Sequence, residues 1–181
     1  MTPEEYIQLK AFARQDGALL SVLWIGAFAC YILGMTRPAL GMAALLAIVV
    51  SPFFAANRLR HFRDDALQGI ISFARAYAYT ILTFFYAGLL LAMAIFLYFN
   101  FMDHGYLLGQ FTSMLNSPEG QQAISAYGLS NEMNEGLKEL ADMRPIDYAL
   151  NMLTINITTG FLLGIPIALL MQRSALHRIK Q

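Results

Sequence analysis

Three histidines and two adjacent aspartates are the side chains of this sequence best suited to binding a metal ion. Asp64 and Asp65 follow an arginine, and together the three could hold a metal and a phosphate. Adjacent carboxylates after a cluster of arginines are more often a solvated turn, and a zinc site needs three or four ligands that converge. The helices expected from the rest of the sequence place His61 and His177 on one side of a membrane and His104 on the other. We therefore expect no metal site.

Motifs for catalysis are also missing from the sequence. It contains no nucleophile elbow, phosphate-binding loop or pair of catalytic acids, so we expect no catalytic residues, no cofactor and no enzymatic activity. The formal net charge is +0, whereas binding of nucleic acid needs Lys and Arg clustered on one face. Nucleic acid is therefore not an expected partner.

Four stretches without a charged side chain are each long enough to cross a bilayer. A helix rises about 1.5 Å per residue and the hydrocarbon core is about 30 Å thick, so roughly 20 apolar residues suffice. The stretches are residues 17–36, 38–57, 76–102 and 148–172. Charged residues make up 13% of the chain, about half of the usual share in soluble domains. The sequence predicts an all-α polytopic membrane protein with four transmembrane helices in a single membrane domain, residues 1–181.

The N-terminal residues predict a separate helix at the membrane surface, over residues 2–16. Thr2 and Glu5 have the spacing of a capping box, and Pro3 stands at the first helical position, where its missing N–H costs nothing.

Positive residues predict the orientation of the chain. They precede the first span, fill the loop 58–75 and follow the last span in the tail 173–181, and such residues stay in the cytoplasm during insertion. We expect both termini and the loop to be cytoplasmic, and residues 103–147 to be an extracytoplasmic helical insertion between the third and fourth spans. Ser117 can cap one short helix that Gly128 ends, and a second begins at Ser130 and ends before Pro145.

Small residues recur at helical spacing on two of the predicted spans. Interfaces between transmembrane helices depend on close backbone approach, which small residues permit. The predicted packing residues are Gly26, Cys30, Gly34, Asn156, Gly160 and Gly164. Pro52 and Pro166 each remove one bond of their helix, and static kinks are a more common result than hinges.

Uncharged polar side chains occur on the last predicted span. They are Asn151, Thr154, Asn156 and Thr158. Pairing across the bundle is their favoured role, and a polar track for a lipid or neutral solute is the alternative. None of the four spans has an ionisable residue in its interior, which argues against a proton relay or an ion-coupled transporter.

The basic loop has a different predicted role. Arg58, Arg60, His61 and Arg63 lie close to the expected headgroup level, where they favour contact with anionic lipid or a cytoplasmic partner.

Two segments resemble a known family. They are FRDDALQGIISFARAYAYTILTFFYAGLL from Phe62 and YGLSNEMNEGLKEL from Tyr127, and the chain is similar to the domain-of-unknown-function 4199 family over nearly its whole length. The resemblance implies a four-span inner-membrane protein of Gram-negative bacteria with a helical external insertion. The family has no established catalytic residues to carry over to this chain. The resemblance suggests a role beside a polyprenyl-phosphate-type glycosyltransferase.

Two functions remain open at this point. The first is a non-catalytic accessory or scaffold subunit of the bacterial inner membrane, in contact with membrane lipids and with a membrane protein partner or further copies of itself. The second is a small transporter or flippase for a lipid or neutral solute. The first is preferred because the sequence offers packing surface and no reactive groups.

Overall fold

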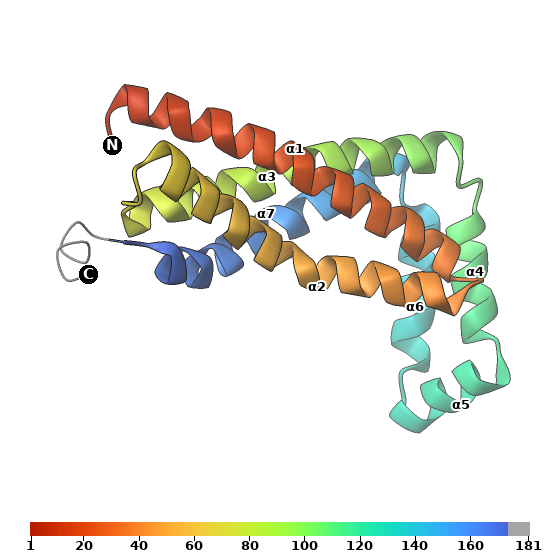
Figure 1. The fold of residues 1–181 in the computed structure, drawn as a ribbon. Helices are drawn as coiled ribbons and strands as arrows, with labels where there is room; N and C mark the ends of the chain where they lie inside the picture. Colours follow the sequence, from red (N-terminus) through yellow and green to blue (C-terminus); the bar gives the residue numbers. More distant parts are fainter. Residues whose placement is uncertain (174–181) are drawn as a thin grey trace. The chain divides into compact units, whose positions relative to one another are not determined.

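The computed structural model describes residues 1–173, which form seven α-helices and one π-helical turn (Figure 1). The elements are α1 (Pro3–Gly34), α2 (Pro38–His61), η1 (Phe62–Ala66), α3 (Phe73–Phe101), α4 (Tyr106–Leu115), α5 (Pro118–Tyr127), α6 (Ser130–Asp142) and α7 (Pro145–Met171). Within residues 1–173, four helical segments are long and apolar enough to span a membrane: α1, α2 with η1, α3 and α7. The chain is an all-α polytopic membrane protein, as predicted. The expected cytoplasmic tail lies, after Arg173, outside the described residues.

The described residues divide into two compact units. Unit 1 comprises Met1–Ala92 and residues 151–173, and unit 2 comprises Met93–Leu150. The long helices α3 and α7 contribute to both units, so each unit is described by itself.

Helix α1 joins two segments that the sequence analysis separates. The surface helix of residues 2–16 and the span of residues 17–36 form one continuous helix, because no proline interrupts the chain between them. Its start is as predicted: the Thr2 hydroxyl accepts from the Glu5 N–H at 3.2 Å, and a Glu5 carboxylate oxygen accepts from the Thr2 N–H at 2.8 Å.

Helices α1 and α2 pack side by side in unit 1 (Figure 1). Near their shared turn, a Cβ added at Gly34 would lie 2.5 Å from the Gly41 nitrogen, so only glycine allows this approach. Farther along, the Trp24 indole N–H donates to the Ser51 hydroxyl at 2.7 Å in a buried contact. Both features join backbones closely, which is how helices associate in lipid.

Glycines also set the contacts with α3. A Cβ at Gly17 would lie 2.7 Å from Tyr86 Cβ and 2.8 Å from the Thr83 carbonyl oxygen. On α7, a Cβ at Gly160 would lie 2.8 Å from Phe84 Cβ, and one at Gly164 would lie 2.9 Å from the Tyr77 ring. Gly160 and Gly164 therefore lie in close contact with α3.

Gly26 does not pack against another helix of the described chain. It is exposed, and no atom of the described chain lies within 4 Å of the position of an added Cβ. Cys30 is half-buried. Eight residues of helix turn through about 800°, so Gly26 and Gly34 point roughly 80° apart and do not share one narrow face.

Unit 2 contains three short helices between the membrane-spanning elements, one more than predicted. Helix α4 follows Asp103, whose carboxylate accepts from the Gly105 N–H at 3.0 Å and the Leu107 N–H at 3.1 Å. Helix α5 has the predicted cap, with the Ser117 hydroxyl accepting from the Gly120 N–H at 3.0 Å, and Gly128 ends it with φ of 67°. Helix α6 begins at Ser130, as predicted.

Replacement of Gly17 by alanine tests the α1–α3 contact. We expect Gly17→Ala to destabilise the protein by about 1–3 kcal/mol, because the methyl group would meet backbone and Cβ atoms that have no room to move. Gly26→Ala is the matched control and should cost no stability, since open space surrounds it. Unfolding in detergent followed by circular dichroism compares the two. Equal stability of both variants would contradict the close approach at Gly17.

Candidate functional site: a buried polar cluster at the basic end of unit 1

One end of unit 1 gathers most of the positive residues of the chain. This basic end is formed by the first half of α1, the last turn of α2, η1, the first turn of α3 and the end of α7. Its cationic residues are Lys10, Arg14, Arg58, Arg60, Arg63, Arg75 and Arg173.

A carboxylate is buried among three helices at this end. Asp16 of α1 is 1% exposed. One of its oxygens accepts from Arg58 Nε of α2 at 2.6 Å, and the other accepts from the Tyr79 hydroxyl of α3. A buried carboxylate without partners costs several kcal/mol, so these two donors are what make its position tolerable. The contact fixes α1, α2 and α3 at one level.

Aromatic rings extend the cluster toward the surface. The Tyr79 ring stacks on Phe62 with centroids 5.0 Å apart and planes at 9°, and Phe12 lies 5.0 Å from Phe62 on a tilted plane. The Arg75 guanidinium carbon lies 5.7 Å from the centre of the Phe62 ring, within the range of a cation–π contact.

Arg63 connects η1 to the end of α7. It is 3% exposed, its Nε and Nη2 donate to the two carboxylate oxygens of Asp64 at 2.7 and 2.9 Å, and its Nη1 donates to the Met171 carbonyl at 3.0 Å. Beside it, Ile71 and Arg173 exchange backbone hydrogen bonds of 3.1 and 3.0 Å. The segment after η1 is thus tied to the last turn of α7.

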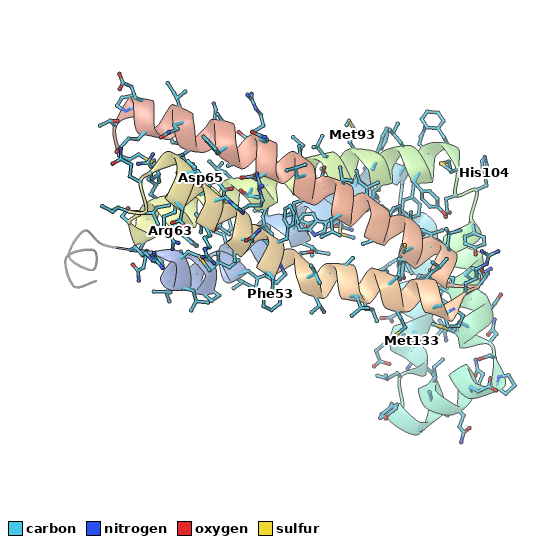
Figure 2. The ribbon with its side chains drawn as sticks, in the orientation of Figure 1. Phe53, Arg63, Asp65, Met93, His104 and Met133 are labelled. Carbon is cyan, nitrogen blue, oxygen red and sulfur yellow. The ribbon has the colours of Figure 1, made fainter. Side chains whose placement is uncertain are left out.

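Of the four residues predicted to contact lipid or a partner, two make hydrogen bonds with groups of the same chain. Arg58 and Arg63 make the contacts described above, because buried acceptors lie within their reach. Arg60 and His61 are exposed. Arg60 Nε lies 3.6 Å from an Asp64 carboxylate oxygen, and His61 Nδ1 lies 3.4 Å from an Asp65 carboxylate oxygen. Figure 2 shows Arg63 and Asp65 at this end of the ribbon.

The predicted polar residues of α7 lie on two faces. Asn156 is buried, its amide donates to the Met152 carbonyl at 2.8 Å, and a Cβ at Gly88 would lie 2.9 Å from its Cβ. Asn151, Thr154 and Thr158 follow the spacing i, i+3, i+7 and are exposed. Asn156 therefore packs against α3, and the other three form a separate exposed polar stripe.

Asp16 and Tyr79 are site residues that the sequence analysis missed. Asp16 stands one residue before a charge-free stretch and therefore looked like the end of a solvated helix. The sequence nevertheless holds a pattern that indicates burial of Asp16. Leu9, Ala13 and Leu20 share its helical face, and all three are buried.

Among the described residues, no group of three or more His, Cys, Asp or Glu side chains is placed to hold a metal ion. His104 lies in unit 2 and contacts the Met102 carbonyl at 3.1 Å, while His177 lies outside the described residues.

A family model described as "Protein of unknown function (DUF4199)" matches residues 15–173. No curated protein and no solved structure matches the chain.

Removal of the Tyr79 hydroxyl tests the buried cluster. Tyr79→Phe should lower the free energy of unfolding by about 1.5–3 kcal/mol, the range for a hydrogen bond to a charged group. Tyr77→Phe is the matched control: its hydroxyl makes an exposed 3.4 Å contact with the Phe161 carbonyl, and we expect a change below about 0.5 kcal/mol. Denaturant unfolding in detergent measures both. Similar small losses would show that Asp16 does not depend on Tyr79.

Proposed function

We propose a function on the premise that this chain belongs to the DUF4199 family, whose description assigns it no activity. The chain acts as a non-catalytic integral membrane subunit that docks a second membrane protein through helix faces. It resides in the bacterial inner membrane with both termini in the cytoplasm.

The exposed polar stripe of α7 is the observation that carries this proposal. Asn151 and Thr158, at the two ends of this stripe, are exposed on a helix whose composition suits a membrane. Lipid tails offer no hydrogen-bonding groups, whereas a neighbouring helix does, and polar side chains of this kind bond across helices. A partner helix on this face could form hydrogen bonds with the side chains of the stripe, whereas lipid tails could not.

The state of the buried charges supports a structural rather than a chemical role. Asp16, Arg58 and Arg63 each bind groups of the same chain. Asp16 is 1% exposed, so a substrate could reach its carboxylate only if the surrounding helices moved apart. The cluster is therefore suited to holding the helices that present the docking face.

The resemblance suggests the class of partner. A polyprenyl-phosphate-type glycosyltransferase is our proposed partner, and a second copy of the chain is the other candidate.

The alternative function, transport of a lipid or neutral solute, needs the polar residues of α7 to follow one path. Asn156 points toward Gly88, on a different face from Asn151 and Thr158. This separation favours docking. Loss of transport in liposomes on Asn156→Leu would favour the alternative.

A bulky substitution in the stripe tests the docking proposal. Thr158→Trp should reduce recovery of the membrane partner after crosslinking in native cells by about tenfold, because the indole fills space that a partner helix needs. Val49→Trp is the control, since Val49 is 61% exposed on α2, away from the stripe. Both variants should keep the circular dichroism spectrum of the unaltered protein. Recovery of a bare monomer from the unaltered protein, or equal capture by both variants, would contradict the proposal.

A further inference from the structure

An open pocket of about 470 Å³ lies at the basic end of unit 1, beside the segment that connects η1 to α3. Leu67, Ile70 and Ile71 contribute apolar surface to its lining, and Glu5, Ser72 and Arg75 contribute polar groups. Asp16, Arg58 and Tyr79 do not line this pocket. The lining combines an apolar wall with one guanidinium group, as an amphiphilic ligand would require.

Arg75 is held in place from three directions. Its Nη1 donates to a Glu5 carboxylate oxygen at 3.3 Å, its Nη2 donates to the Gln8 side-chain oxygen at 3.0 Å, and the Phe62 ring lies beneath it. A guanidinium has five N–H donors, and these contacts use two of them. Arg75 Nε is shielded from solvent and is a buried side-chain nitrogen without a hydrogen-bond partner in the described chain. The group is oriented and retains donors for a ligand.

A guanidinium of this kind recognises an oxyanion, because its fork of donors matches a phosphate in geometry and charge. The contact to Glu5 is the longer of the two that Arg75 makes. Glu5 also accepts from the Thr2 N–H through its other oxygen, so it can release Arg75 to a ligand without losing the cap of α1.

The surroundings favour a phosphate that belongs to a lipid. The pocket lies where helices of membrane-spanning length end, and the basic end has more Lys and Arg than Asp and Glu. Basic residues at such a place attract anionic headgroups. The apolar wall lies beside the guanidinium. A lipid whose phosphate binds the guanidinium could therefore place its acyl chain against this wall.

We propose that this pocket binds a phospholipid, with the phosphate on Arg75 and the adjoining part of an acyl chain against Leu67, Ile70 and Ile71. The proposal is independent of the docking function, because none of these residues belongs to the exposed stripe of α7.

Binding of phosphatidylglycerol to the delipidated full chain, measured by native mass spectrometry in detergent, tests the proposal. Arg75→Gln should weaken binding by about tenfold, the change expected for loss of one charge-assisted contact. Arg14→Gln is the matched control: Arg14 is exposed on α1 at the same end, and its removal should change binding by less than about twofold. Ile70→Glu leaves Arg75 in place and should also weaken binding, so it carries the test if Arg75→Gln does not fold.

Three results would overturn the proposal. They are unchanged lipid binding in Arg75→Gln or Ile70→Glu, an equal loss in Arg14→Gln, and displacement of phosphatidylglycerol by inorganic phosphate at a similar concentration. The second would indicate a diffuse basic surface, and the third a site for free phosphate.

Discussion

A buried carboxylate needs hydrogen-bond donors, and this need determines how the helices of unit 1 meet. Asp16 is withdrawn from water, and the energetic penalty for that withdrawal falls only when Arg58 of α2 and the Tyr79 hydroxyl of α3 reach it. Three helices must therefore meet at one level. The stacked rings of Tyr79 and Phe62 follow from the same meeting point, because Phe62 continues directly from the end of α2.

Along the spans a different interaction takes over. Helices in lipid gain little from burying apolar side chains against each other, so their contact depends on how closely the backbones approach. Gly34 against Gly41 and Gly160 against Phe84 provide such an approach. Unit 1 thus combines a polar tie at its basic end with small-residue contacts farther along. Much of α2, Phe53 included, keeps apolar side chains exposed (Figure 2).

Local signals in the sequence predicted most of the fold, because they act through neighbouring residues. The Thr2 cap, the Ser117 cap and the four apolar stretches are of this kind. The partners of Asp16 could not be predicted in this way. They lie 42 and 63 residues away along the chain, and no spacing rule connects such positions. Helix α4 was missed although its signal is local: it begins just after Asp103, whose carboxylate accepts from the Leu107 N–H, and after a left-handed Gly105. The faces of Gly26 and Asn156 were decided by packing against other helices.

The position of Trp24 has a spectroscopic consequence. It is the single tryptophan of the chain, its indole N–H is bound to Ser51 of α2, and its ring meets Phe84 of α3 edge-on with centroids 5.4 Å apart. Emission from an indole responds to the polarity and hydrogen bonding around it. The tryptophan emission of the purified, unlabelled protein in liposomes therefore reports on the junction of α1, α2 and α3, and a shift in its wavelength would register a separation of those helices.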